Sequence, residues 1–272
     1  MKFRCKMTDS LAMRDFTNII GAIAKMSKFC VLQLTPTDVC FTVFDERQPV
    51  VWAELSRDHF FSEYLVEGIS SENKIYLEFD AVMLSKSMTS LKQTATSVKI
   101  KLTNKQQPCL TLEIELPSAS SDSWQCVHDV PIKMVARKEW PSYNPPDIPT
   151  FHISLALPQL KHLKNVAEKM KNLSPMLSLY ASNDGMLILK IETESACVST
   201  HFPGLYVYNE IEIEEERISV TVDVKKFIMF LAWESVHPET VKCSIRQDTL
   251  VYLHLNLNDN FKIHYFLPAT VL

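Results

Sequence analysis

Hydrophobic and polar residues alternate over many short segments of this chain, a pattern typical of strands that bury one face. Four longer segments instead repeat their apolar residues every three or four positions, which predicts amphipathic helices. In the first half, the patterns predict strands at residues 2–7, 31–35, 39–45, 50–55, 75–79, 98–103 and 109–116, and helices at 10–28 and 80–95. In the second half, they predict strands at 151–157, 176–182, 186–192, 197–202, 218–222, 241–245, 250–255 and 261–266, and helices at 158–173 and 223–234.

Residues that start helices and turns stand at the ends of these segments. Pro158 lies in the first turn of a predicted helix, where its missing N–H does no harm. The sequence Asn183-Asp184-Gly185 predicts a tight hairpin between two strands. The plausible N-caps are Asp9 or Ser10, Asp80 and Asp223.

The two halves follow the same order of elements, offset by roughly 140 residues, which indicates a duplicated domain. Between them lie a serine-rich stretch at 117–123 and a group of prolines, which lack the N–H donor and disfavour helix before them. We therefore predict a first domain at 1–117, a connector at 118–149 and a second domain at 150–272. Because each domain combines two helices with antiparallel sheet, the predicted fold class is α+β.

Each predicted helix has an apolar face and a polar face. The helix at 158–173 shows this best, because Leu160, Leu163, Ala167 and Met170 recur on one side. The polar faces of the helices are rich in basic residues. Those that we expect to point outward are Arg14, Lys25, Lys28, Lys86, Lys92, Lys161, Lys164, Lys171 and Lys225.

Positive charge is concentrated in the helices. The whole chain has 28 basic and 32 acidic residues, a net charge of −4. The four predicted helices carry eleven basic and five acidic residues, a net +6, which leaves −10 for the rest. Such helices would attract phosphates without reading base sequence, and an acidic outer sheet would keep nucleic acid away. The alternative is that these lysines only solvate the helix faces.

The sequence carries no catalytic signature. Its four glycines lie at least nineteen positions apart, which excludes phosphate-binding loops and a nucleophile elbow. The histidines form no HExxH motif, and seven scattered cysteines indicate reduced thiols rather than a disulfide framework or a zinc site. His128-Asp129 could suggest a catalytic base, but a polar step into a strand at 130–135 is the preferred interpretation. We therefore predict no enzymatic activity, no cofactor and no metal.

Two further segments have bland interpretations. The run at 210–216 contains five glutamates, which we interpret as a solvated edge strand or loop rather than a metal site. The longest apolar run, at 227–233, is far too short to cross a bilayer, and no apolar signal core follows the N-terminus. We therefore expect an intracellular protein that does not bind membranes.

Short stretches in both halves resemble one protein family, the Hus subunit of the checkpoint sliding clamp, or 9-1-1 complex, within the proliferating-cell nuclear antigen type of clamp. The resemblance spans the whole chain, and it is the order and spacing of the stretches that make it specific. They are MKFRCK (1–6), KIYLE (74–78), KIKLTNKQQPCLTLEIEL (99–116), HDVPIK (128–133), RKEW (137–140), VAEKMKNLS (166–174), LILKIETE (187–194), THF (200–202) and YFLPA (265–269). The chain is short between Phe202 and Ile218, so no family function is carried over to that loop.

The resemblance implies two similar domains whose helices line the hole of a ring and whose sheets form its outside. It also implies a heterotrimer with two other clamp subunits, double-stranded DNA in the hole, a clamp-loader ATPase, docked repair and checkpoint proteins, and a nuclear location. Clamp subunits join when an edge strand of one chain extends a sheet of the next. By position, the residues of the two edges would be Cys109, Leu110, Thr111, Leu112, Glu113 and Ile114, and Cys197, Val198, Ser199 and Thr200.

Two other functions stay open on the residues alone. An enzyme that uses scattered carboxylates would show metal-dependent turnover. An adaptor of the same fold would not contact DNA at all. The sequence leaves open whether the chain assembles with copies of itself and whether its role is specialised, for example in meiosis.

Overall fold

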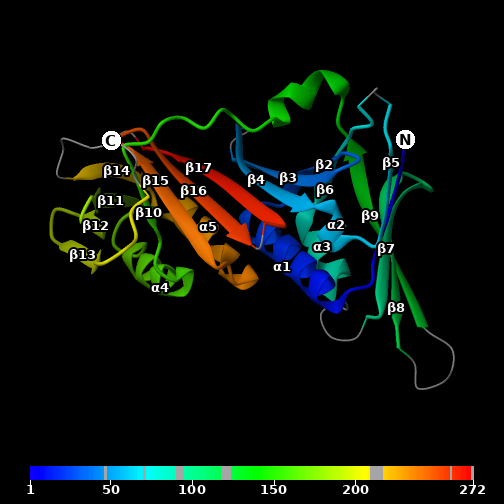
Figure 1. Cartoon of the computed structure of the whole chain (residues 1–272), viewed down its shortest axis with the longest axis horizontal. Coiled ribbons are helices and arrows are strands. Elements are labelled where there is room, and N and C mark those ends of the chain that lie inside the picture. The colour runs from blue at the N-terminus through cyan, green and yellow to red at the C-terminus, as the bar shows by residue number, and fades with distance from the viewer. Residues whose placement is uncertain are drawn as a thin grey trace. The chain divides into compact units, whose positions relative to one another are not determined.

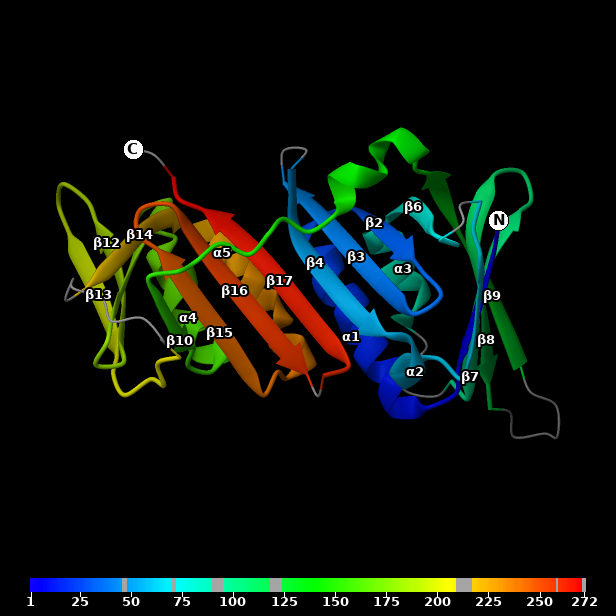
Figure 2. The same cartoon turned by 45° about the horizontal axis from the view of Figure 1, so that its top comes forward.

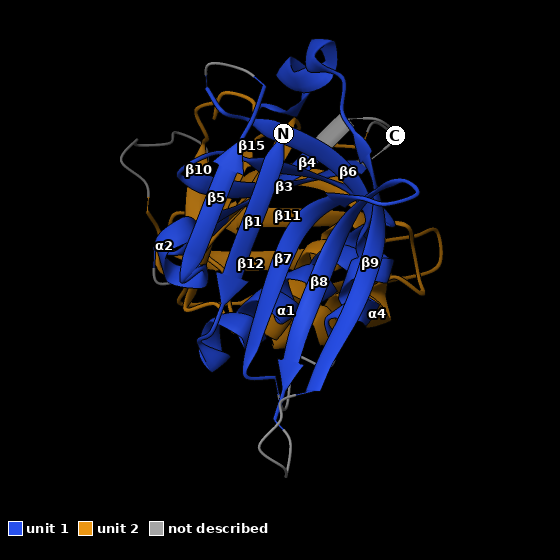
Figure 3. Ribbon diagram, turned by 90° about the vertical axis from the view of Figure 1, so that its right-hand side faces the viewer, with its two compact units in different colours: residues 1–145, 259–262 blue, residues 146–258, 263–272 orange. Residues whose placement is uncertain are grey.

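The computed structural model describes residues 1–45, 48–69, 72–89, 95–117, 124–208, 217–257 and 259–270. The chain forms two compact units, the first made of residues 1–145 and 259–262, the second of residues 146–258 and 263–272 (Figure 3).

The first unit is an antiparallel sheet with two main helices on one face. Its elements are β1 (Lys2–Met7), α1 (Ser10–Met26), β2 (Phe29–Leu34), β3 (Asp38–Asp45), β4 (Gln48–Ser56), α2 (Arg57–Phe60), β5 (Glu63–Glu67), β6 (Ile75–Asp80), α3 (Ala81–Ser87), β7 (Ser97–Asn104), β8 (Pro108–Leu116), β9 (Trp124–Met134) and the 3-10 helix η2 (Arg137–Tyr143). The strands pair in the order β4-β3-β2-β6-β9-β8-β7-β1-β5. Helices α1 and α3 pack together beneath β2, β3, β4 and β6 (Figure 1).

The second unit repeats this topology. Its elements are β10 (Ile153–Ala156), α4 (Leu160–Met170), β11 (Met176–Ser182), β12 (Met186–Glu192), β13 (Cys197–Phe202), β14 (Ile218–Asp223), α5 (Val224–Phe230), the 3-10 helix η3 (Leu231–Val236), β15 (Thr240–Arg246), β16 (Leu250–Leu257) and β17 (Phe261–Pro268). Strands pair as β13-β12-β11-β14 and as β10-β15-β16-β17, with α5 behind β16 and β17 (Figure 2).

The strand order shows how completely the two units correspond. In order along each sheet, β4-β3-β2-β6 matches β13-β12-β11-β14, and β1-β7-β8-β9 matches β10-β15-β16-β17. Even β5, which flanks β1, has a counterpart, because Val207 bridges to Leu155 on the outer side of β10. The duplication inferred from the order of elements is therefore present in the topology.

A side-chain cap and a regular apolar face explain why residues Ser10–Met26 form helix α1. The Asp9 carboxylate accepts hydrogen bonds from the backbone N–H groups of Leu11 (2.6 Å) and Ala12 (3.1 Å), which have no partner inside the helix. Ile19, Ile20 and Ile23 are fully buried, as the three- and four-residue spacing predicts.

The prediction of a connector at 118–149 is wrong for most of the described part of that segment. Residues 118–123 lie outside the described residues, but β9 pairs with β8 and β6 inside the first unit. Helix η2 is then held by aromatic contacts, because the Trp140 ring stacks on Tyr76 at 4.7 Å and the Trp52 Nε1–H donates to the Tyr143 carbonyl oxygen at 2.9 Å. These two contacts hold η2 against the first unit, although Pro141 lies inside the helix.

One further prediction needs correction, and two short elements were missed. The helix expected at 80–95 ends at Ser87, and residues 90–94 lie outside the described part of the chain. Strand β5 and the short helix α2 were not predicted, since their residues show no clear period.

No helix among the described residues is long and apolar enough to cross a membrane.

Candidate nucleic-acid and subunit interfaces

In the first unit, the predicted basic residues lie on the solvent side of the helical layer. Arg14 and Lys25 on α1, Lys28 just after it and Lys86 on α3 are all exposed, opposite the buried isoleucines of α1. The sequence prediction of an outward position is confirmed for these four residues. Lys92 lies outside the described residues.

In the second unit, Lys161 lies in the first turn of α4, Lys171 directly follows α4 and Lys225 lies in the first turn of α5, and all three are exposed. Lys164 is different. It is half-buried, and its Nζ lies 3.7 Å from a carboxylate oxygen of Glu234 on η3, the element that packs against α4. A long, partly exposed ion pair of this kind is weak. Glu234 therefore only partly offsets the electrostatic attraction of Lys164 for an anionic ligand.

Most of these cations have no acidic partner. Arg14 approaches its neighbour Asp15 at 3.5 Å, and Lys28 lies over the Phe29 ring at 5.2 Å. Within the described residues, no ion pair involves the remaining exposed lysines of the set. These are Lys25, Lys28, Lys86, Lys161, Lys171 and Lys225. The helical layers therefore carry positive charge that is available to an anionic ligand.

The opposite face of the first unit does not have the acidic character that we expected. On β5, β1, β7, β8 and β9, which lie side by side in Figure 3, the charges are balanced. Lys2 pairs with Glu67 (2.9 Å), Arg4 with Glu63 (3.9 Å), Lys101 with Glu113 and Lys105 with Asp129 (2.7 Å). The prediction of an acidic outer sheet is wrong here, because basic side chains lie directly or diagonally across from the acidic ones.

The predicted first edge strand is also wrong. The residues Cys109, Leu110, Thr111, Leu112, Glu113 and Ile114 belong to β8, which is hydrogen bonded to β7 on one side and to β9 on the other. Leu112 and Ile114 are fully buried. The serine-rich stretch after β8 leads into a further strand of the same sheet, and that strand takes the position we had given to β8.

Strand β9 provides the free edge instead. It pairs with β8 from Trp124 to Pro131, but with β6 only from Ile132 onward. The other side of residues 124–131 has no strand partner among the described residues. The Trp124 and Val127 side chains on this segment are 69% and 52% exposed.

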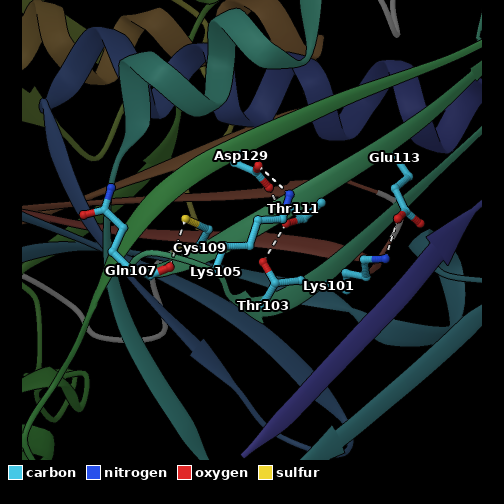
Figure 4. A network of polar contacts seen from close by, with 8 residues as sticks. All are labelled: Lys101, Thr103, Lys105, Gln107, Cys109, Thr111, Glu113 and Asp129. Carbon is cyan, nitrogen blue, oxygen red and sulfur yellow. Dashed lines mark hydrogen bonds and ion pairs between the residues drawn. The ribbon is translucent and has the colours of Figure 1, made fainter.

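A polar network fixes β9 against β8 and β7 (Figure 4). The Thr111 hydroxyl donates to the Asp129 carboxylate (2.5 Å), the Thr103 hydroxyl lies 2.7 Å from that of Thr111, and the Lys105 ammonium donates to Asp129 (2.7 Å). Hydrogen bonds from Lys105 and Thr111 lower the pKa of Asp129 below its usual value. The only carboxylate between Trp124 and Pro131 is thus bound by side chains on the β8 side of the strand.

The second predicted edge is confirmed as an edge. Strand β13, which contains Cys197, Val198, Ser199 and Thr200, pairs with β12 and with no other strand in the described ranges. Its first three residues are exposed, and it contains no lysine, proline or carboxylate. Its participation in a subunit interface stays a prediction.

Several groups that could take part in chemistry are bound by other side chains or buried. Asp129 is bound to Lys105 and Thr111, so its carboxylate is not a free base. Burial raises the pKa of the Cys243 thiol to about 12 and raises those of Cys5 and Cys30 as well. No cluster of metal-ligating side chains occurs in the described residues, and the glutamate run at 210–216 lies outside them.

Comparison with solved structures defines the class of protein. The chain superposes on the proliferating cellular nuclear antigen of Entamoeba histolytica with a TM-score of 0.74 (9% identity, 99% of each chain). It superposes on that of Thermococcus kodakaraensis with a TM-score of 0.70 (17% identity, 98% of this chain and 99% of the other). At these identities the similarity shows the fold, which is that of a sliding-clamp subunit.

Sequence comparison then identifies the family. The family described as Hus1-like protein matches residues 1–271. The chain is 40% identical to human Checkpoint protein HUS1 (99% of both chains) and 29% identical to Drosophila melanogaster Checkpoint protein Hus1-like (99% of both). It is 26% identical to Schizosaccharomyces pombe Checkpoint protein hus1 (95% of this chain, 94% of the relative). The chain therefore belongs to the Hus1 family of checkpoint proteins.

Proposed function

We propose that this chain is one subunit of a heterotrimeric ring that encircles duplex DNA at sites of damage in the nucleus. Two other clamp subunits complete the ring, and a separate ATPase loads it. The chain itself is not catalytic, and its outer face is a platform for checkpoint and repair proteins.

The six exposed helical lysines without ion pairs support the DNA-facing part of this proposal best. Ammonium groups that are not neutralised by the protein can replace the counterions of DNA phosphates. Such contacts do not read bases, so a ring that makes them can slide. Arg14 and the partly paired Lys164 would add to the same field, and Lys92 belongs to the same set by sequence.

The two unpaired edges support ring assembly. An exposed edge strand normally carries lysine, proline or an unmatched charge that prevents other chains from pairing with it. Neither β13 nor the free segment of β9 before Pro131 has this protection. Pairing with neighbouring subunits would satisfy both edges, with β9 in the role that we first gave to β8.

Alanine at Lys25, Lys28, Lys161 and Lys171 tests the DNA-facing role. A matched control replaces four lysines that are already in ion pairs, namely Lys2, Lys74, Lys101 and Lys190. Both variants lose the same charge. We expect the helical variant to load poorly onto nicked plasmid within the assembled ring, and the control to load normally. Equal loading of both variants would show that the lysines only solvate the helices, as in a DNA-free adaptor.

A further inference from the structure

Trp124 is exposed in a way that the other tryptophans of the chain are not. Trp52 and Trp233 are fully buried, and Trp140 stacks on Tyr76. Trp124, the first residue of β9, leaves 69% of its surface in water. Large aromatic side chains contribute much of the binding energy of interfaces. An exposed tryptophan on an unpaired strand edge therefore indicates a binding site for another chain.

The surroundings of Trp124 favour an added strand over any other partner. Successive side chains of a strand point to opposite faces, so Trp124 and Val127, three positions apart, lie on opposite faces of the same free edge. A strand that pairs with residues 124–130 would cover both side chains at once. The carboxylate of Asp129 would not repel it, because Lys105 and Thr111 bind that group (Figure 4).

We propose that Trp124 is the anchor of the contact between this chain and one of its two neighbours in the ring. The partner is an edge strand flanked by aliphatic side chains that enclose the indole. This inference rests on the ring assembly proposed above, and it assigns Trp124 to the contact with only one of the two neighbours. A ring member has two different edges, so Trp124 serves the neighbour on the β9 side and has no part in the contact made by β13.

The test measures the affinity of this chain for each of the two other clamp subunits separately. We expect Trp124→Ala to weaken one pair by about thirtyfold or more, as anchor tryptophans do when truncated, and to leave the other pair unchanged. Trp124→Phe should recover most of the affinity. The matched control is Tyr206→Ala in the second unit, which removes an aromatic ring that is 68% exposed but not on β9, and it should leave the β9-side pair at wild-type affinity.

The possible outcomes distinguish failure of the Trp124 proposal from failure of the ring proposal. Unchanged affinity for both neighbours would overturn the anchor and leave the ring intact, and equal weakening of both would reveal general damage rather than an anchor. If the wild-type chain binds neither neighbour, the ring proposal itself fails. Acrylamide quenching of the wild-type chain gives a check without substitution, because Trp124 fluorescence should become protected when the β9-side neighbour is added. Persistent quenching in the complex would contradict the anchor.

Discussion

At the residue scale, the structure shows which side chain caps the N-terminus of helix α1. The sequence allowed either Asp9 or Ser10 as the N-cap of α1, and the hydrogen bonds to Leu11 and Ala12 select Asp9. The choice matters because a capping side chain satisfies backbone donors that the helix leaves open.

Replacement of the cap should therefore be costly at only one of these two positions. We expect Asp9→Ala to lower the free energy of unfolding by about 1 kcal/mol, because two N–H groups lose their acceptor. Ser10→Ala, inside the helix, should change the free energy of unfolding by no more than a few tenths of a kcal/mol. Urea unfolding of both variants checks this, and equal losses would show that Asp9 is not the cap.

Asp129 gives a prediction about pH. Its pKa is lowered in the folded chain, so folding favours the ionised carboxylate. The stabilisation is fully present above the ordinary carboxylate pKa of about 3.9 and is lost as the pH falls through the lower folded value. We expect Asp129→Asn to be less stable than the wild type at pH 7. The difference should shrink as the pH is lowered from about 5 to about 3 in denaturant titrations. A difference that stays constant over this range would indicate that the charge of Asp129 does not matter.

At the scale of elements, whether a strand lies at the edge of a sheet depends on which other strands pair with it. Strands β8 and β13 were both predicted to be edges, but only β13 is one among the described residues. The deciding fact is the presence of β9, which begins after a serine-rich stretch that gave no sign of returning to the sheet.

Cysteine chemistry can report on the β13 edge. Cys197 is exposed at the start of β13, whereas Cys5, Cys30 and Cys243 are buried with raised pKa values. In the isolated chain we expect iodoacetamide to modify Cys197 faster than these three, and Cys197→Ser to remove the fast reaction. Addition of both clamp partners should slow the reaction at Cys197. An unchanged rate in the assembled ring would exclude β13 from the interface.

At the scale of the whole molecule, charged side chains form ion pairs on some surfaces and lack them on others. The outer face of the first unit has its charges matched in cross-strand pairs, and the helical layers do not. The net positive charge of the helices was visible in the sequence. The expected acidic outer face was not found in the first unit, because acidic side chains of that face have basic partners.

The lysine variants described above also make a quantitative prediction for the assembled ring. Each phosphate contact that is lost should reduce the slope of log affinity against log salt concentration by about 0.9. Removal of Lys25, Lys28, Lys161 and Lys171 should therefore lower the slope markedly, whereas removal of the ion-paired control lysines should not. Equal slopes for the two variants would contradict a DNA-facing helical layer.

The sequence by itself determined most of the elements, the duplicated order and the basic helix faces, because periodicity, caps and turns act over a few residues. A cap at Asp9 or Ser10, the hairpin at Asn183-Asp184-Gly185 and the buried face of α4 could all be predicted in this way. Tertiary structure decided which strands are edges, that η2 docks on Tyr76 and Trp52, and that Lys164 meets Glu234. These features join residues far apart in the chain, and no local pattern encodes which distant strand or side chain will lie opposite.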